Sequence, residues 1–498
     1  MNANLAPNDP SLNNSYLELP QLFHARIAPT PVSSPRLLRL NRPLAEQLGL
    51  DPDWLESPEG VTILAGNRVA ETSAPVALAY AGHQFGNWVP QLGDGRAILL
   101  GEVVDQDGIR RDIQLKGSGL TPFSRAGDGR ASLGPVIREY LVSEAMAGLG
   151  IPTTRALAMV ATGDQVRRME LEPGGILSRV AASHIRVGTF EYASRRGDQA
   201  DVQALADYVI ARHFPELASA DQPYQALIEA IAAQTADLIA DWLMVGFIHG
   251  VMNTDNLSIS GETLDYGPCA FMDNYDPATV FSSIDTFGRY AYNQQPMIAN
   301  WNLARFAETL MPLLANDRDT AIEQAQAALD TYGSRFDQSY QTGLRRKLGL
   351  QTHEKDDNEL GQDLLQRMAD QGADYTLTFR RLSELRLADS AGDDRVRELF
   401  ADGTAFDDWA ARWRQRLQRE ASEDATRQQQ MRRVNPAYIP RNHRVEYAIQ
   451  AAMQEDNWEP FDALLKVITD PFQDHPDSSY LTTPPRPEEV VKQTFCGT

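Results

Sequence analysis

The sequence predicts an α+β fold in which a strand-rich N-terminal part precedes a helical C-terminal part. Residues 76–200 hold short apolar runs that alternate in polarity or are bounded by glycine, which is typical of strands. Beyond about residue 200 nearly every apolar pattern has helical spacing. The chain has 498 residues and is 42% hydrophobic, so it is long enough to bury a sizeable core.

The strand predictions rest on short local patterns. Residues 88–92 and 97–100 read as strands around a tight turn, because Gly93 and Gly95 permit the positive φ that a hairpin needs. Residues 111–116 alternate in polarity and run into a glycine-rich segment. Further strand-like pieces, which complete a small sheet, cover residues 154–162 and 175–180.

Helices are predicted where apolar residues recur at helical intervals. One helix begins near Pro135, which suits a first helical turn, and its apolar stripe ends before Gly148. Glu139 lies off that stripe. A longer helix covers residues 224–245; it carries several acidic residues, so we expect it to lie in the protein core and not in a membrane.

The overall charge limits the partners. A formal net charge of -22 disfavours binding to nucleic acid or to an anionic membrane, since both need clustered Lys and Arg. The first twenty residues have neither the basic nor the apolar region of a secretory signal, and Cys269 and Cys496 are too few for a disulfide framework. We therefore expect a cytoplasmic protein that binds neither nucleic acid nor membrane.

A cluster of polar residues follows the longer helix. His249, Asp255 and Asn256 come directly after it, and Asp265-Tyr266-Gly267 begins nine residues after Asn256. Protein kinases have an Asn and an Asp-aromatic-Gly in this order, because both hold metal ions on ATP. Where a kinase has its catalytic Asp, five residues before the Asn, this chain has Val251. The pattern indicates a kinase-like metal site without the usual base.

Lys116 and Glu139 extend this pattern. Lys116 ends a predicted strand, and Glu139 follows 23 residues later in the next helix. Taken alone, such a pair is usually two separate surface charges. In kinase-like folds the glutamate holds the lysine on the nucleotide phosphates. With Asn256 and Asp265 following in order, the set favours a bilobal, protein-kinase-like fold with a β-rich N-lobe and a helical C-lobe.

Other residues could contact a nucleotide, although each has a simpler structural explanation. The turn at residues 93–96 could cover phosphates or be an ordinary hairpin. Arg179 and Arg186 could supply local positive charge or form surface ion pairs. We expect His249 to pack and to hydrogen-bond the backbone. Asp255 could accept a proton from a hydroxyl or brace its loop.

Several segments together resemble the selenoprotein O family, and the resemblance extends from about residue 15 to the C-terminal Cys-Gly-Thr. They read YAGHQFG at 80–86, LGDGR at 92–96, QLKGSG at 114–119, TPFSR at 121–125, DGR at 128–130, HGVMNTDN at 249–256 and DYGP at 265–268. This family is described as a pseudokinase fold that binds ATP in an inverted orientation and transfers AMP to protein hydroxyls. The inversion would explain Val251.

The resemblance implies roles for particular residues. Asp255 would be the catalytic proton acceptor, and Asn256 and Asp265 would hold Mg²⁺, with Mn²⁺ as an alternative. The residues that would contact ATP are Gly93, Gly95, Arg96, Lys116, Asp128, Gly129, Glu139, Arg179, Arg186 and Asp265. The implied partners are proteins with Ser, Thr or Tyr hydroxyls, including the enzyme itself, and we expect a monomer.

The fold prediction divides the chain into consecutive parts. We expect an N-terminal extension over residues 1–75, a nucleotide-binding N-lobe over 76–200, a helical C-lobe with the catalytic and metal-binding loops over 201–400, and a C-terminal helical extension and tail over 401–498. Cys496 stands where the selenium-containing members of the family have selenocysteine. A reversible disulfide between Cys269 and Cys496 would make the activity redox-dependent.

Other function classes remain open. The protein could be an ordinary kinase acting on a protein or a small molecule, or a non-catalytic nucleotide-binding scaffold. Val251 speaks against the kinase, because it cannot serve as a base. The combined presence of Lys116, Glu139, Asn256 and Asp265 speaks against the scaffold, since a scaffold needs no complete metal site.

Overall fold

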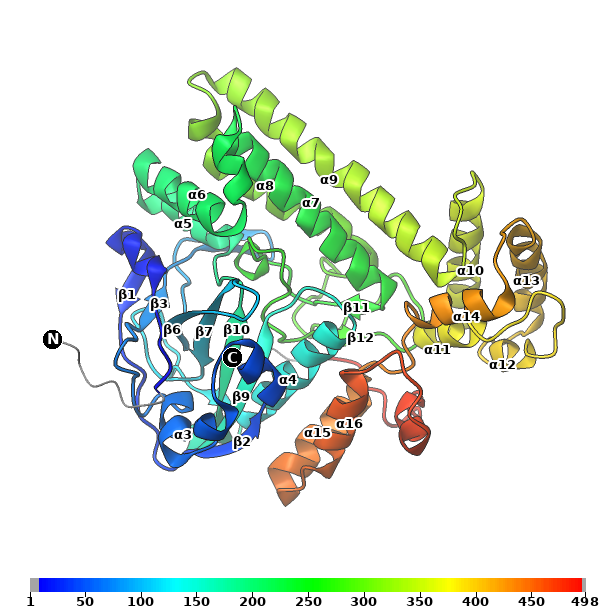
Figure 1. Ribbon diagram of the computed structural model, residues 1–498, viewed down its shortest axis with the longest axis horizontal. Coiled ribbons are helices and arrows are strands. Elements are labelled where there is room, and N and C mark those ends of the chain that lie inside the picture. Colours follow the sequence, from blue (N-terminus) through cyan, green and yellow to red (C-terminus); the bar gives the residue numbers. More distant parts are fainter. Residues whose placement is uncertain (1–8, 495–498) are drawn as a thin grey trace.

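The computed structural model describes residues 9–494. The architecture is a mixed α/β fold in which an antiparallel sheet and its flanking helices lie beside a larger group of helices (Figure 1). Strands come first in the chain and helices dominate after about residue 187, which agrees with the predicted α+β order.

The central sheet has eight strands, all paired antiparallel. In spatial order the main path is β1 (His24–Arg26), β3 (Val76–Leu78), β6 (Ala97–Val104), β7 (Arg110–Lys116), β10 (Leu171–Ala181), β9 (Arg155–Arg167) and β2 (Arg36–Leu40), and β8 (Ala131–Ser132) pairs with β10. Both edge strands of this path, β1 and β2, come from the first 75 residues. That segment is therefore built into the sheet.

The predicted hairpin around residues 93–96 is wrong. β5 (Asn87–Val89) pairs with β4 (Gly82–Gln84) in a separate two-stranded ribbon, while β6 pairs with β3 and β7. Gly93 does have a positive φ of 80°, but the chain uses it to leave one ribbon and enter another sheet. Short strands with polar and apolar residues do not reveal their partners, so the sequence pattern could not separate these arrangements. A third small ribbon joins β11 (Phe247–Ile248) and β12 (Ala270–Phe271).

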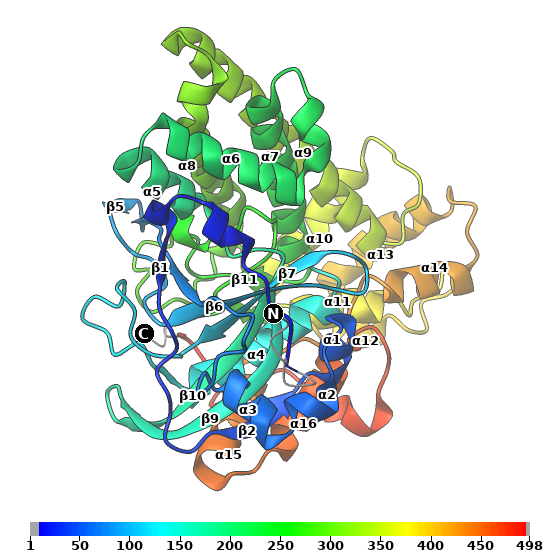
Figure 2. The ribbon, with the colours of Figure 1, turned by 60° about the vertical axis from the view of Figure 1, so that its left-hand side comes forward.

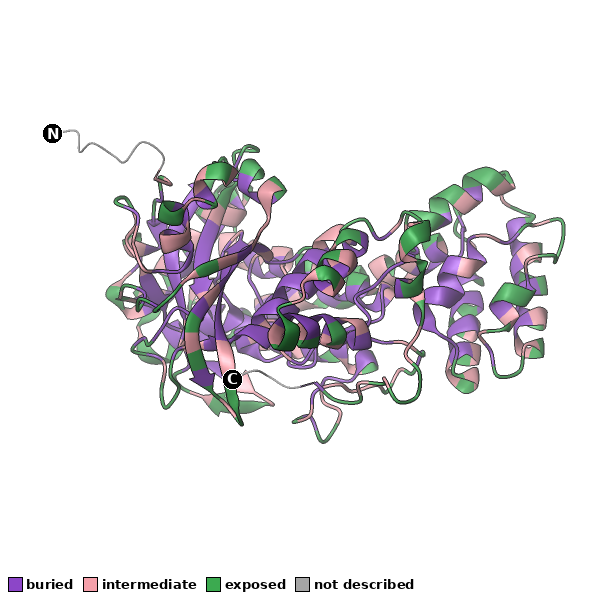
Figure 3. Ribbon diagram, turned by 90° about the horizontal axis from the view of Figure 1, so that it is seen from below, coloured by how far each residue is buried: buried purple, intermediate pink, exposed green. Residues whose placement is uncertain are grey.

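Helices cover both faces of the central sheet. One face packs against α1 (Arg42–Gln47), α2 (Pro52–Leu55) and α3 (Pro58–Leu64). The other face packs against α4 (Leu133–Gly148), and α4 is covered in turn by α15 (Asn442–Glu455) and α16 (Glu459–Ile468). Because α4 lies between two apolar layers, most of its side chains are buried, Glu139 among them. Figure 3 shows the buried residues concentrated in the sheet and along the inner faces of the helices.

The remaining helices form two apolar cores. α7 (Pro223–Met244), the predicted long helix, is central to the first, with α5 (Val187–Arg196), α6 (Gln199–His213), α8 (Gln295–Leu314) and α9 (Arg318–Lys347). The second contains α10 (Asp357–Gln371), α11 (Tyr375–Leu382), α12 (Asp394–Arg397), α13 (Thr404–Leu417) and α14 (Asp424–Arg432). Short 3₁₀ turns occur at Ser15–Glu18, Gln21–Phe23, Pro215–Ser219, Thr254–Asn256, Tyr292–Gln294 and Pro476–Thr482. Within residues 9–494, no helix has the length and apolar character that a membrane crossing requires.

Candidate active site

Three cations and two carboxylates converge where β7, β10 and α4 meet the helical part. Lys116 ends β7, and its Nζ lies 2.6 Å from Glu139 Oε2 and 3.0 Å from Asp265 Oδ1. Arg179, on the neighbouring strand β10, places Nη1 2.6 Å from Asp265 Oδ1 and 3.3 Å from Glu139 Oε1. The predicted contact between Lys116 and Glu139 is therefore present, and Glu139 points into the cluster because α4 packs directly on the sheet.

Asp265 is the centre of this cluster. It adopts a left-handed backbone conformation with φ 62°, which is uncommon for a residue other than glycine and is found at functional sites and turns. Burial acts to raise the pKa of its carboxyl group, but the charges of Arg186, Lys116 and Arg179 hold that pKa well below its usual range. Asp265 is therefore an anion fixed among cations.

Arg186 joins the loop at residues 249–256 to Asp265. Its Nη1 donates to Asp265 Oδ2 at 2.5 Å and to the backbone carbonyl of Asp255 at 2.6 Å. The guanidinium also stacks on the ring of Tyr80, 4.7 Å from its centroid. One buried arginine thus brings together the two loops that the sequence predicted to form a metal site.

The loop at residues 249–256 is held by hydrogen bonds from its side chains to backbone carbonyls. His249 is fully buried, its Nε2 lies 2.9 Å from the carbonyl of Leu264, and its ring stacks on Trp242, which confirms the predicted structural role. Asn256 Nδ2 donates to the carbonyl of Val251 at 2.9 Å. Val251 is buried and stands at the position where kinases carry the catalytic base. Its backbone carbonyl accepts the hydrogen bond that orients Asn256.

Asp255 is a buried carboxylate, and one of its two oxygens has no hydrogen-bond partner among the described residues. Oδ2 accepts a hydrogen bond from Gln84 at 3.2 Å, whereas Oδ1 is buried and accepts none from the described residues. A Cβ on Gly82 would lie 2.5 Å from Oδ1, so the β4–β5 ribbon lies against this carboxylate. Burial raises the pKa of Asp255 to about 6. These properties suit a group that takes up a proton near neutral pH.

The glycine-rich segment forms a wall beside the cations. Gly93 and Gly95 pack on Phe123, because a Cβ would lie 2.4 Å from its ring at the first and 2.9 Å from its carbonyl at the second. The carbonyl of Arg96 accepts a hydrogen bond from Gly117 N at 2.7 Å, directly after Lys116. The backbone of residues 93–96 therefore lies next to Lys116, where a turn that covers phosphates is expected.

Asp128 and Gly129 lie in the loop after this wall, and no hydrogen bond or ion pair within the described residues joins them to the cation cluster. Asp128 pairs with Arg168 at 2.8 Å on the exposed end of the sheet. Gly129 has φ 70°, and a Cβ there would lie 2.2 Å from Gly119, so the position admits only glycine. Their predicted contact with ATP stays a prediction.

Some residues of the site were not predicted from the sequence. Gln114 accepts from Arg179 Nη2 at 2.6 Å and donates to the buried Asp94 at 2.9 Å. Tyr80 and Gln84 contact Arg186 and Asp255, as described above. All of these residues lie within or beside the quoted motifs YAGHQFG, LGDGR and QLKGSG, and that proximity was the available signal.

The predicted disulfide partners differ in what the structure describes. Cys269 is a free, fully buried thiol, and burial raises its pKa to about 12. Cys496 lies outside the described residues. The described tail nevertheless returns to this region, because Thr494 Oγ1 donates to the carbonyl of Pro268, and Thr494 N donates to Phe281 O at 2.8 Å.

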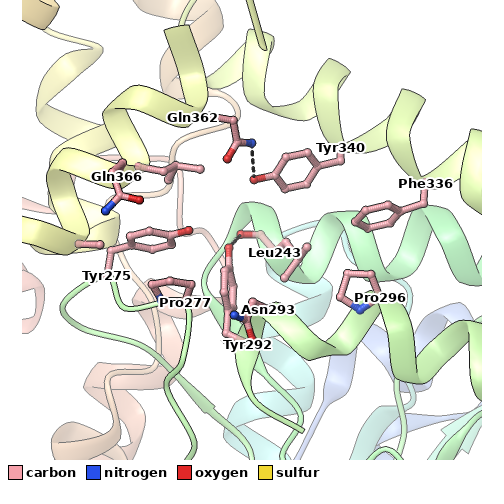
Figure 4. A pocket seen from close by; sticks show the side chains of 12 residues that line it. Leu243, Tyr275, Pro277, Tyr292, Asn293, Pro296, Phe336, Tyr340, Gln362 and Gln366 are labelled. Atoms are coloured by element: carbon pink, nitrogen blue, oxygen red, sulfur yellow. Dashed lines mark hydrogen bonds between the residues drawn. The ribbon is translucent and has the colours of Figure 1, made fainter. Parts of the chain in front are cut away.

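A separate cavity of about 350 Å³ lies where α7, α8, α9 and α10 meet (Figure 4). Its walls are mainly aromatic rings and amides, and Gln362 donates to Tyr340 Oη at 3.3 Å. None of the predicted nucleotide or metal residues lines it. The cavity therefore does not belong to the cation cluster.

The donors for a metal ion are few. Within the described residues, no group of three or more His, Cys, Asp and Glu side chains is arranged to hold a metal. Asn256 and Asp265 offer an amide oxygen and a carboxylate, and the bond from Asn256 Nδ2 to Val251 leaves Oδ1 as the ligand atom. All-oxygen donors fit Mg²⁺, which keeps several water or phosphate ligands of its own.

Comparison with known proteins identifies the family of the chain. A family model described as protein adenylyltransferase SelO matches residues 10–469. Proteins named protein nucleotidyltransferase YdiU from Rhodopseudomonas palustris strain BisB5 and Bradyrhizobium sp. strain ORS 278 are 63% and 62% identical over 486 residues. These alignments cover 98% and 97% of this chain and 99% and 98% of the two relatives. The chain belongs to the protein adenylyltransferase SelO family.

Proposed function

We propose that this protein transfers AMP from ATP to hydroxyl side chains of proteins, itself included. The observation that carries the proposal is the convergence of Lys116, Arg179 and Arg186 on one carboxylate beside a catalytic loop that has Val251 in place of the kinase base. The family name and the names of the relatives support the same activity.

The cations would bind the phosphates of ATP. In the transfer of a nucleotidyl group, negative charge develops around the α-phosphorus and on the leaving pyrophosphate, so fixed positive groups stabilise the transition state. Lys116 is held by Glu139 and Arg179 by Gln114, so neither side chain has to reorganise during the reaction. The hydroxyl of the protein substrate attacks the α-phosphorus, its proton passes to Asp255, and pyrophosphate leaves.

Asp255 suits the role of proton acceptor better than that of a loop brace. Its side-chain oxygens make only one hydrogen bond within the described residues, from Gln84, while the brace of the loop is the backbone carbonyl that binds Arg186. Asn256 and Asp265 would hold Mg²⁺ or Mn²⁺. When bound, such an ion neutralises charge on the ATP phosphates.

We also propose that the sheet and the helical part correspond to the two lobes of a kinase-like fold. The lysine on a strand, the glutamate on the following helix and the Asn and Asp loops occur in the kinase order, and they meet in space. The boundaries near residues 75, 200 and 400 stay predictions, as do the cytoplasmic location and the monomeric state.

A redox switch between Cys269 and Cys496 remains part of the proposal. Its support is the contact of Thr494 with Pro268, the residue before Cys269. Because the Cys269 thiol is buried, the disulfide requires local opening of the segment after Gly267. Peptide mapping under non-reducing conditions, before and after mild oxidation, tests it; two free thiols after oxidation would refute it.

Labelled ATP tests the proposed reaction. With ATP labelled at the α-phosphate, we expect label on the enzyme or on added proteins, whereas ATP labelled at the γ-phosphate should leave them unlabelled. A phosphotransferase gives the reverse pattern, and a scaffold gives no label from either position. The label should be lost in Lys116→Ala and Asp265→Ala.

A further inference from the structure

An aromatic and cationic surface adjoins the catalytic loop. Trp88 of the β4–β5 ribbon is 37% exposed, and the ring of His83 lies between it and Trp301 of α8, with centroids 5.0 Å and 5.4 Å away. Arginines stack on both tryptophans. This arginine–tryptophan surface consists of His83, Trp88, Arg195, Arg289, Trp301 and Arg305. Figure 2 shows β5 next to α5, the helix that carries Arg195.

The surface is fixed directly to the catalytic loop. The backbone N–H of His83 donates to Thr254 Oγ1 at 2.7 Å, and Thr254 Oγ1 donates to the buried Glu191 at 2.5 Å. The other oxygen of Glu191 lies 2.6 Å from His83 Nδ1. Because Thr254 precedes Asp255, the position of the surface is set by the same turn that carries the proton acceptor.

The arginines of the surface are available for an external anion. Within residues 9–494, neither Arg195 nor Arg289 forms an ion pair, and Arg305 pairs with the half-exposed Glu308 at 2.6 Å. Their guanidinium centres lie 4.9–5.8 Å from the tryptophan rings. Stacking of this kind buries the face of a guanidinium and leaves N–H groups at its edge to bind carboxylates. In Arg289 and Arg305 the Nε atom is itself buried, so a carboxylate would bind the Nη groups.

Local charge agrees with this geometry. Burial lowers the pKa of His83, and the charges of Arg305, Arg195 and Arg289 lower it further. The acidic groups beside the surface include Glu308, the buried Glu191 and the buried Asp285, whose carboxylate accepts a hydrogen bond from the backbone N–H of Arg289. In a chain with a formal net charge of -22, this is a positive surface beside the active site.

We propose that this surface binds an acidic segment of the protein substrate and so presents the neighbouring hydroxyl to Asp255. The inference rests on the proposed function and adds the chemistry of the substrate to it. Asp255 is only 7% exposed and lies against Gly82 and Gln84, so a substrate that reaches it meets the β4–β5 ribbon first. Carboxylates flanking the acceptor residue would pair with the arginines, while apolar atoms pack on Trp88.

Binding of defined peptides tests the surface without any reaction. The probes are two fluorescent peptides with one central serine, flanked by glutamates in the first and by lysines in the second. In fluorescence anisotropy the acidic peptide should bind and the basic one should not. Arg195→Ala and Arg289→Ala should each weaken binding of the acidic peptide about tenfold, and added salt should weaken it as well.

Control variants separate this effect from misfolding. Arg335→Ala removes an exposed arginine of α9 and should bind the acidic peptide like the wild type. Calorimetric titration with ATP should give the same affinity for all variants. Equal affinity for the two peptides, or an acidic peptide that binds both surface variants as tightly as the wild type, would overturn the proposal. A single-stranded oligonucleotide that displaces the peptide and loses affinity in the same variants would overturn it too, by assigning the surface to nucleic acid.

A labelling experiment with the same peptides distinguishes the proposed surface from the proposed AMP transfer. With ATP labelled at the α-phosphate, the acidic peptide should be modified with a lower KM than the basic one, and the surface variants should raise that KM. Selective binding without label transfer would support the surface and overturn the proposed reaction. Label transfer with no preference for acidic peptides would support the reaction and overturn the surface.

Discussion

Asp265→Asn removes the anion on which three buried cations converge. In the folded protein Asp265 pairs with Lys116, Arg179 and Arg186, whereas Glu139 pairs with Lys116 and Arg179 only. The variant keeps the pairs of Glu139 with Lys116 and Arg179 and removes the carboxylate with which Arg186 pairs. Removing one partner of a buried ion pair costs about 3–5 kcal/mol of folding free energy. Because the Asp265 side chain keeps 22% exposure, we expect the lower end of that range, about 3 kcal/mol.

Nucleotide should partly reverse this loss. The phosphates of ATP offer the freed cations new anionic partners, so ATP without metal should stabilise Asp265→Asn more than it stabilises the wild type. ATP with Mg²⁺ should instead stabilise the wild type more, since the variant lacks the carboxylate ligand. Thermal unfolding with no ligand, with ATP and a chelator, and with ATP and Mg²⁺ measures all three states.

Asp237→Asn is the matched control for this experiment. Asp237 pairs with Arg335 on the surface, where both side chains are more than a third exposed, so its loss should cost about 1 kcal/mol or less. The reasoning would be refuted if Asp265→Asn melted like the wild type, or if it responded to ATP with Mg²⁺ as strongly as the wild type.

Three further variants follow from the structure. Asp255→Asn should keep ATP binding and lower turnover by about 10²–10⁴-fold; an equal loss of ATP affinity would make Asp255 a loop brace. Gly82→Ala places a methyl 2.5 Å from Asp255 Oδ1, so steady-state kinetics should show a lower kcat, and a kcat equal to the wild type would contradict the close approach. Lys347→Met tests the effect of a buried amine on stability, because burial lowers the pKa of Lys347 from 10.5 to about 7. Between these two pH values the unfolded chain binds a proton that the folded protein does not, so the stability of the wild type rises with pH. Thermal melts should show the variant more stable near pH 7, with the gain shrinking toward pH 10.5; a gain independent of pH would contradict it.

The sequence predicted the parts of the site that lie on regular elements. Lys116 at the end of a strand and Glu139 in the next helix were paired because Asn256 and Asp265 follow them in the order found in kinases, and they lie 2.6 Å apart. Helical periodicity also placed the long helix before the catalytic loop, within one residue at each end. Such features succeed because strand and helix periods are local properties of the chain.

The predictions that were wrong, and the residues that were not predicted, depend on contacts between segments distant in sequence. The hairpin prediction for residues 93–96 was wrong because strand pairing depends on tertiary context. Glu191 and Gln84 escaped notice because each is an unremarkable polar residue until the fold brings it to Thr254 or Asp255, more than sixty positions away in sequence.

Mass analysis of a modified protein tests the central claim most directly. After incubation with ATP and Mg²⁺, the wild type should carry AMP on Ser, Thr or Tyr, with pyrophosphate released, and Lys116→Ala should carry none. A phosphoryl group on those residues, with ADP released and with dependence on Asp255, would contradict the account and identify a kinase with a displaced base.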